Sequence, residues 1–478
     1  MRNRITCLFI LSFTCSLVPT LTAESPPADM FAKRRQILME KMDGGVAVLR
    51  SNEVVTRNGD VHYNYRQGSD FYYLSGFEEP GSALLFIPGA KHQFIMFVRP
   101  RNVVTEIWDG KRYGTKGAMK FFGADTAYNI KQFEAVFKNS VRGKEKLYAS
   151  INDANPADPL LSLLRNLKDE KPKEIINPRP VIAEMRLFKS AEEIAIMRRS
   201  IEITGEAHIE AFKAATPGMS EYELEAIISY IYRKNGSARA GFPSIIGAGE
   251  NSTVLHYNTN NDQIQNGDVI VMDIGAEYKY YSADITRTIP ANGIFSKEQR
   301  KIYSIVLKAQ QAGIDMIKPG IAIGTIQNRI KAVVKEGLFD LGLITDTSSR
   351  WQYRVWFMHG SMHWLGLDVH DAGSYREPDG SSRILKPNMV TTVEPGIYIN
   401  ANALQNLKNN KRIRASADEL DDFIQKVRPV AAQYTNIGVR IEDDILVTSN
   451  GHELLSGKAP RTIEAIEALM KKESYVNK

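Results

Sequence analysis

Three of the eight histidines in this 478-residue chain lie in one short stretch, FMHGSMHWLGLDVHD. They are His359, His363 and His370, and an imidazole can ligate a metal, transfer a proton or hydrogen-bond a substrate near neutral pH. His359 and His363 have the i, i+4 spacing of the HExxH metalloproteases, but glycine stands where that motif has glutamate, and the residues after His363 alternate like a strand. We therefore expect three imidazoles on a loop and a strand that point in different directions, so that one could bind a metal while others contact substrate.

Four carboxylates lie inside apolar, strand-like runs, where an unpaired charge is costly. They are Asp273 in VMDIGA, Asp284 in SADITRT, Glu394 in TVEPGIY and Glu442 in VRIEDD. One such acid would most often be a structural ion-pair partner. Four of them together with a histidine cluster favour a site, because buried like charges repel unless a cation neutralises them.

Four carboxylates and one imidazole form an oxygen-rich ligand set, which two divalent metals bridged by carboxylates would satisfy. Manganese is the leading candidate because such ligands are hard, with zinc, cobalt and iron as alternatives. A structural zinc site is disfavoured because the only two cysteines, Cys7 and Cys15, precede the predicted fold.

The composition indicates an ordinary globular protein with no nucleic-acid partner. Hydrophobic residues make up 43% of the chain and charged residues 24%, and the length allows two or three domains. The net charge of +6 is modest, and no basic stripe with interleaved aromatics occurs. Residues from about 30 to 175 alternate between strand and helix patterns, with apolar strands in SALLFIPG and HQFIMFVRP. The proline-containing segment INPRPVIAEMRLFKS places a domain boundary near residue 180.

The residues after this boundary predict an α+β domain with a faint internal repeat. Capping boxes begin helices at Ser190 and Ser296, and a Pro-Gly pair ends each helix before another apolar helical pattern. The strand-like runs VIVMDIGAEY and MVTTVEPGIYI hold isolated carboxylates. We expect a duplicated helix–helix–strand unit around a curved sheet.

The first 23 residues predict a secretory signal peptide. Arg2 and Arg4 precede the apolar run ITCLFILSFTCSLV, and a short polar stretch ends near Ala23. A membrane anchor is disfavoured because the run is shorter than the ~20 residues that span a bilayer. Cleavage would remove both cysteines, and an exported chain without cysteine suits a bacterial periplasm better than a disulfide-forming secretory route. We therefore expect an exported protein, periplasmic or secreted.

Five ordered motifs resemble the proline-specific pita-bread metallopeptidases, in particular the bacterial Xaa-Pro aminopeptidases. They are VMDIGA, SADITRT, MHGSMHWLGLDVHD, TVEPGIY and GVRIEDD, and two further stretches, RQGSDFYYLSGFEEPG and TEIWDGKRYG, resemble the N-terminal domain of that family. The resemblance implies an α+β fold, with a pita-bread catalytic domain built on a curved antiparallel sheet and preceded by a smaller α/β domain. The predicted division is a signal peptide at 1–23, an N-terminal domain at 24–180 and a catalytic domain at 181–478.

The resemblance also implies a ligand set for two divalent metal ions. Asp273 would be a bidentate ligand of one metal. Asp284 and Glu442 would bridge both metals, and His363 and Glu394 would complete the second site. Glu394 would also take the proton from the attacking water and pass it toward the leaving nitrogen.

Other residues that match the family motifs would bind substrate. His256 in VLHYN matches a histidine near the scissile nitrogen, and His370 matches one near the scissile carbonyl. His359 would wall the proline pocket, and Arg440 would support the metal-binding aspartate. Trp108 in TEIWDGKRYG would face a substrate site, in the family often that of a neighbouring subunit, which implies a homodimer or tetramer. The alternative for this tryptophan is a place in a core.

The predicted enzyme hydrolyses the bond between a first residue and a following proline in peptides. One alternative is a prolidase, which would need a cation to capture the free carboxylate of a dipeptide. The insert between Glu394 and Glu442 offers six candidates: Lys408, Lys411, Arg412, Arg414, Lys426 and Arg428. A non-catalytic pita-bread binding protein and a creatinase-like enzyme without metals are less favoured, because all five ligand positions are filled.

Overall fold

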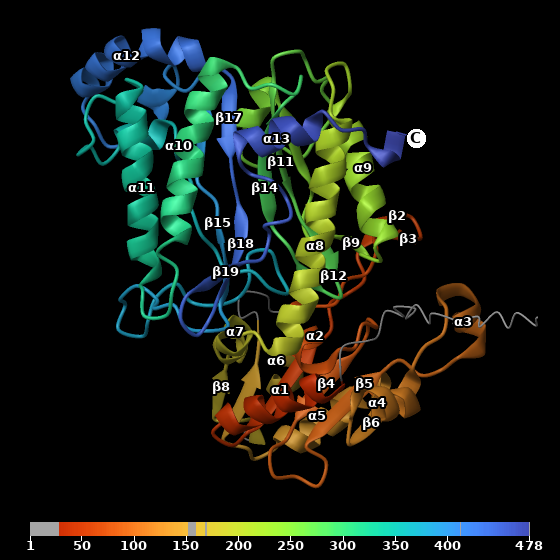
Figure 1. Cartoon of the computed structure of the whole chain (residues 1–478). Helices are drawn as coiled ribbons and strands as arrows, with labels where there is room; N and C mark the ends of the chain where they lie inside the picture. Colours follow the sequence, from red (N-terminus) through yellow and green to blue (C-terminus); the bar gives the residue numbers. More distant parts are fainter. Residues whose placement is uncertain (1–27, 152–158, 168–169, 412, 478) are drawn as a thin grey trace, which may run out of the picture.

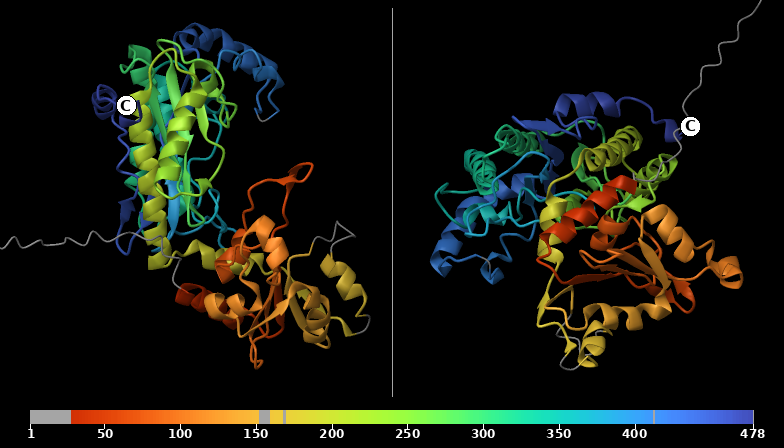
Figure 2. Two further views of the ribbon diagram at one scale, coloured as in Figure 1. Left: turned by 90° about the vertical axis from the view of Figure 1, so that its right-hand side faces the viewer. Right: turned by 90° about the horizontal axis from the view of Figure 1, so that it is seen from below.

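The structure, a computed structural model, describes residues 28–151, 159–167, 170–411 and 413–477. The predicted signal peptide lies outside the described residues. The residues before helix α8 (Ala191–Ala214) form a smaller body below the rest of the chain in Figure 1, and Figure 2 shows the same division from two further directions. None of the helices in the described ranges is long and apolar enough to cross a membrane.

A six-stranded mixed sheet organises the N-terminal body. Its strands are β1 (Val46–Arg50), β4 (Ala83–Phe86), β5 (Phe94–Val98), β6 (Thr126–Asn129), β7 (Lys146–Ala149) and β8 (Glu174–Ile176). The order is β6-β5-β4-β1-β7-β8, with antiparallel pairs at β1–β4 and β4–β5 and parallel pairs elsewhere. The two strands predicted from SALLFIPG and HQFIMFVRP are confirmed as β4 and β5, which are buried along their whole length.

Short helices surround this sheet, and one hairpin projects from it. The helices are α1 (Ala28–Lys41), α2 (Ser69–Ser75), α3 (Val103–Asp109), α4 (Gly114–Phe122), α5 (Phe133–Val141), α6 (Pro159–Arg165) and α7 (Arg179–Leu187). The hairpin consists of β2 (Thr56–Asn58) and β3 (Val61–His62). Helix α7 packs against α1 and α2, so it belongs to the N-terminal body.

Two helical hairpins form the frame of the larger body. They consist of α8 with α9 (Glu221–Lys234), and of α10 (Lys297–Ile314) with α11 (Ile323–Asp340). The predicted capping boxes are present at Ser190 and Ser296, where each serine hydroxyl accepts from the backbone N–H three residues later. Gly218 and Gly320 in the connecting Pro-Gly turns adopt φ of 95° and 89°, a region that favours glycine. The expected repeat of a helix–helix unit is therefore present.

Every strand pair among the described residues of this larger body is antiparallel, as the predicted fold class requires. Its main strands are β10 (Ile245–Ala248), β11 (Val269–Ile274), β14 (Ile285–Pro290), β15 (Val390–Val393), β16 (Gly396–Ile399), β17 (Ile437–Arg440) and β18 (Asp443–Val447). Strand β11 pairs with β10 and β14, β15 with β18, and β16 with β17. Helix α8 packs on β14, and α10 packs on β15, β16 and β17, so the helices cover one face of the strands (Figure 1).

The larger body also contains four short strands and two further helices. They are the strands β9 (Arg239–Ala240), β12 (Ala276–Tyr278), β13 (Tyr281–Ser282) and β19 (His452–Leu454), and the helices α12 (Ala417–Ala431) and α13 (Ile463–Met470). Helix α12 belongs to the insert between Glu394 and Glu442 and lies beside α11 at the far end from the N-terminal body (Figure 1).

Buried ion pairs join the two bodies. Arg186 on α7, with a side chain 5% exposed, donates to Asp70 of α2 and to Asp368 and Asp371 of the larger body. Lys189 donates to the second oxygen of Asp371 at 2.9 Å. The first sheet ends at Ile176, before this junction, and α8 begins after it.

Candidate metal centre and active site

Strand pairing brings together carboxylates that lie far apart in the sequence. Asp273 is on β11, where the register pairs it with Thr286 of β14, and Asp284 immediately precedes that strand. Glu442 lies between β17 and β18, and its backbone N–H donates to the Thr286 carbonyl at 3.0 Å. Glu394 lies between β15 and β16. The four acids predicted from their apolar surroundings therefore sit where adjacent strands meet.

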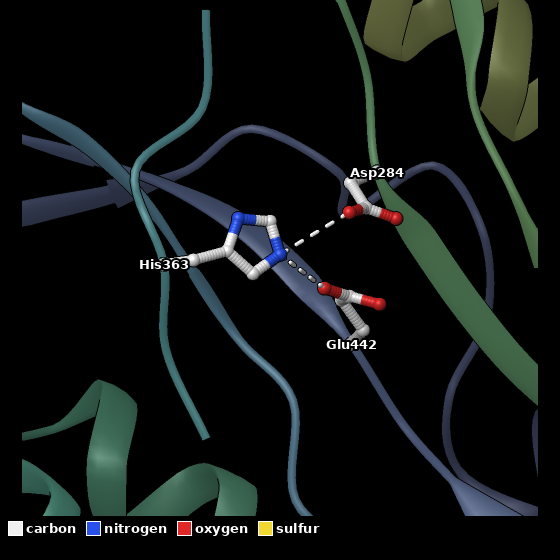
Figure 3. Close-up of side chains that lie close together, drawn as sticks. All are labelled: Asp284, His363 and Glu442. Atoms are coloured by element: carbon white, nitrogen blue, oxygen red, sulfur yellow. Dashed lines mark ion pairs between the residues drawn. The ribbon is translucent and has the colours of Figure 1, made fainter. Parts of the chain in front are cut away.

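Asp284, His363 and Glu442 converge on one point (Figure 3). The Nε2 atom of His363 lies 3.3 Å from Asp284 Oδ2, 3.5 Å from Glu442 Oε1 and 3.6 Å from Glu394 Oε1. The other ring nitrogen, Nδ1, lies 3.0 Å from the Trp364 carbonyl, to which it donates. Because Nδ1 donates to this carbonyl, Nε2 is the ring nitrogen that faces the carboxylates and that would offer its lone pair to a bound metal.

The donor set fits divalent metal ions. Asp273 Oδ1, Asp284 Oδ1 and Glu442 Oε1 are buried atoms without a hydrogen-bond donor. An unsatisfied buried polar atom costs roughly 1–3 kcal/mol, and more when it is charged. Carboxylate oxygens and an imidazole nitrogen are ligands for manganese, zinc and iron. Bound cations would therefore supply the partner that each of these three oxygens lacks.

The crowding of charge shifts the pKa values of the acids. Burial and the neighbouring Glu442 raise the pKa of Asp284 well above its usual range and that of Glu394 to about 8. Burial also raises the pKa of Glu442. Burial opposes a charged ring at His363, but contacts with Asp284 and Glu442 outweigh it and raise the pKa of this imidazole. The carboxylates can stay ionised together only beside positive charge.

A hydrogen-bonded chain connects Asp273 to His359. Arg440 donates to Asp273 Oδ2 at 2.7 Å and to the Tyr398 hydroxyl at 2.9 Å. That hydroxyl lies 2.9 Å from His359 Nε2, while His359 Nδ1 donates to the Gly360 carbonyl. The Tyr398 hydroxyl therefore accepts from Arg440 and donates to His359. Burial and the Arg440 charge lower the pKa of His359 to about 4, which keeps the imidazole neutral.

Tyr398 has no predicted role, although it links two residues that do. Its side chain is fully buried in β16, and a tyrosine in an apolar strand most often belongs to the core. Only the partners of its hydroxyl reveal the connection.

His370 and His256 lie at the exposed side of the cluster. The ring centroid of His370 is 4.5 Å from that of His363, and burial together with the His363 charge lowers its pKa. His256 follows the short 3-10 helix η3 (Gly249–Thr253), and the carbonyl of the preceding Leu255 accepts from Arg440 at 3.3 Å, which brings this loop to the site. The roles predicted for these imidazoles stay predictions.

Trp108 lies outside this cluster, on α3 of the N-terminal body. Its side chain is 85% exposed, so the alternative of a core tryptophan is wrong. Val103, Val104 and Ile107 on the same helix are also exposed, and Figure 1 shows α3 at the outer edge of the N-terminal body.

Two further acids, next to Glu442, hold neighbouring strands in place. The sequence analysis assigned them no role. Asp443 pairs with Arg287 at 2.6 Å, and both side chains are fully buried. Asp444 Oδ2 accepts from the Asp284 backbone N–H at 3.2 Å. These contacts lock the start of β18 onto β14 and so fix the separation between Asp284 and Glu442.

Comparison with known proteins agrees with this site. Residues 195–449 match the metallopeptidase family M24, and residues 31–148 match the aminopeptidase P, N-terminal domain. The Xaa-Pro aminopeptidase of Escherichia coli (strain K12) is 38% identical over 454 residues, which cover 92% of this chain and 97% of that protein. The human Xaa-Pro dipeptidase is 32% identical, over 93% of this chain and 94% of that protein. An alanine variant of E. coli aminopeptidase P in complex with substrate has 37% identity and a TM-score of 0.84, covering 94% and 99% of the two chains.

An antiparallel α+β body that carries buried carboxylates around one imidazole, preceded by a separate α/β body, defines a metallopeptidase. The chain belongs to metallopeptidase family M24. The resemblance read from the five sequence motifs is therefore confirmed.

Proposed function

We propose that this chain is an aminopeptidase that releases the first residue from peptides whose second residue is proline. The observation that carries the proposal is the convergence of Asp284, His363 and Glu442, with Glu394 3.6 Å from His363 and Asp273 on β11. The Xaa-Pro aminopeptidase similar to this chain over nearly its whole length supports the choice of substrate.

Asp273, Asp284, His363, Glu394 and Glu442 would hold two divalent ions, which we propose to be manganese. Such ions, when bound, acidify a water molecule and polarise a carbonyl. Manganese suits the oxygen-rich donor set, and the only nitrogen among the five ligands is His363 Nε2.

The protein's own residues would orient the peptide and move its protons. Glu394 would take the proton of the attacking water and carry it toward the leaving nitrogen. His370 would donate to the scissile carbonyl oxygen, and His256 would contact the nitrogen. A proline nitrogen within a peptide has no N–H, so the enzyme must recognise proline by the shape of the pocket that holds its ring. We assign one wall of this pocket to His359, whose ring is held by the Tyr398 hydroxyl.

A dipeptidase is less favoured, because none of the five candidate cations in the described part of the insert is among the residues that line the cavity next to His359. Lys408 pairs with Asp421, and Lys426 pairs with Asp422. Arg412 lies outside the described residues. The insert residues that line the cavity next to His359 are uncharged. The described part of the insert therefore contributes no cation to this cavity that could capture a dipeptide carboxylate.

Product analysis separates the two functions. Metal-loaded protein is incubated with Ala-Pro, Ala-Pro-Ala and Ala-Pro-Ala-Ala, with Ala-Ala-Ala as the control for proline. We expect free alanine from both longer proline peptides and far less from the control. Hydrolysis confined to Ala-Pro would point to a dipeptidase, and equal release from Ala-Ala-Ala would remove the proline requirement.

We also propose a homo-oligomer in which α3 meets a second copy of the chain. The exposed apolar side chains of Trp108, Ile107 and Val103 support this, because contiguous exposed apolar residues favour association. Sedimentation of the protein tests it, since a monomer at micromolar concentration would rule out a stable assembly.

We propose that the chain is exported, to the periplasm or beyond the cell. The support is the basic, apolar and small-residue pattern of residues 1–23. Fractionation of expressing bacterial cells, with N-terminal sequencing of the product, tests the proposal: an uncleaved N-terminus in the cytoplasm would contradict it.

A further inference from the structure

A cavity of about 860 Å³ opens beside the metal centre on the side of His359. His359, Gly360 and Tyr398 form its inner wall, so the cavity adjoins the hydrogen-bonded chain that reaches Asp273. Its size lies within the ~300–1,000 Å³ range of pockets that hold small ligands, enough for a few peptide residues.

Three separate parts of the chain build the outer walls. Helix α11 contributes Lys331, the 3-10 helix η4 (Gln352–Val355) contributes Arg354, and the insert contributes η5 (Leu407–Asn409). The insert is held against the larger body by the contact of Phe423 on α12 with Trp351, whose ring centroids are 5.0 Å apart. The insert therefore forms one wall of a cavity at the active site.

The charged side chains that line the cavity in the described residues are both positive. Lys331 and Arg354 line it together with asparagines and apolar side chains, and no aspartate or glutamate is among the lining residues that the structure describes. Lys331 Nζ donates to Asn328 at 3.2 Å, and Arg354 Nε donates to the Tyr353 hydroxyl at 3.3 Å. Within the described ranges, neither cation forms an ion pair with a carboxylate. Both retain donors for an anionic group.

We propose that this cavity binds the part of the peptide that follows proline and that Lys331 and Arg354 bind a carboxylate on it. The inference rests on the proposed function, which places proline against His359 and hence the following residues beyond it. Lys331 and Arg354 attract a carboxylate, and no acidic side chain among the described lining residues opposes them, so the cationic end of the cavity is the place where one is stabilised. The carboxylate can come from the C-terminus of a short peptide or from an acidic side chain.

Peptide pairs that differ only in the terminal charge test the proposal. The substrates are Ala-Pro-Ala, Ala-Pro-Ala-Ala and Ala-Pro-Ala-Ala-Ala, each as free acid and as C-terminal amide. At one or more of these lengths we expect the amide to have a KM roughly three- to tenfold higher at equal kcat, because partly exposed ion pairs contribute little each and act on binding alone. An amide that ends in glutamate shows whether a side-chain carboxylate serves as well.

The double variant Lys331→Met/Arg354→Met should lose the preference for the free acid. Arg329→Met is the matched control, because Arg329 is an exposed cation of α11 that does not line the cavity. It should keep the preference. Equal KM for acid, amide and glutamate amide at every length would overturn the proposal, as would a preference that survives in the double variant. Failure to release alanine from any of these peptides would instead contradict the proposed function itself.

Discussion

Replacement of Arg186 by methionine tests whether the buried ion pairs between the two bodies stabilise the protein. Arg186 contacts three carboxylates, which differ in how far water can solvate them once the guanidinium is removed. Asp70 and Asp368 have side chains 23% and 41% exposed, so water can solvate both. Asp371 is 1% exposed and keeps Lys189, which is equally buried, as its one charged partner, together with a long hydrogen bond from the Asp368 backbone N–H.

The expected cost follows from this difference. Removal of one partner of a buried pair costs about 3–5 kcal/mol, and the remaining Lys189 places Arg186→Met near the lower end, at about 3 kcal/mol. With an unfolding entropy of about 2.1 cal/mol/K per residue over a domain of roughly 300 residues, the melting temperature should fall by about 5 °C. Because His370 lies between Asp368 and Asp371, kcat should fall as well.

Differential scanning fluorimetry of metal-loaded protein measures the shift. Arg179→Met is the control, since Arg179 lies on the same helix, is 72% exposed and is 3.8 Å from Asp70. It should melt within about 1 °C of the parent, as surface pairs contribute little. An unchanged melting temperature in Arg186→Met would refute the reasoning, because it would mean that Asp371 loses nothing when this partner is removed.

Three further outcomes are expected. Burial lowers the pKa of His208 to about 3, so below pH 6.5 the unfolded chain takes up a proton that the folded chain does not. The free energy of unfolding should therefore fall by about 2 kcal/mol between pH 7 and pH 5, and this part of the fall should be absent in His208→Gln. Denaturant titrations at the two pH values measure the difference. Glu394→Gln should keep metal and lose roughly 10²–10⁴ in turnover, whereas His363→Ala should lose metal, as metal analysis beside turnover would show; wild-type turnover in Glu394→Gln would refute its assigned role. Trp108→Ala should raise KM for peptides and leave the melting temperature nearly unchanged, because the side chain is 85% exposed; a large loss of stability would argue against a role in substrate binding.

Local sequence patterns predicted the parts of the site that depend on local rules. Asp273 and Glu394 stand out because each interrupts an apolar run, and the cost of burying a charge makes such positions conspicuous without any structure. The helix starts at Ser190 and Ser296 follow from capping boxes, whose partners are three residues apart. The strands β4 and β5 follow from apolar runs bounded by turn residues.

The features that the sequence did not predict depend on contacts between distant segments. The hydroxyl of Tyr398 meets Arg440 forty-two positions away, and nothing in GIYI distinguishes it from a core tyrosine. Lys331 and Arg354 look like ordinary surface cations until the insert walls the cavity beside them. Lys408 was one of six candidate cations for the alternative dipeptidase, and its ion pair with Asp421 on helix α12 is visible only in the structure.

One measurement tests the central claim that the buried carboxylates and His363 act through bound metal. Protein stripped with a chelator is titrated with manganese, while bound metal per chain and alanine release from Ala-Pro-Ala are followed together. The account predicts no release from the stripped protein and activity that rises with metal toward about two ions per chain. Full activity in a rigorously metal-free sample would contradict it.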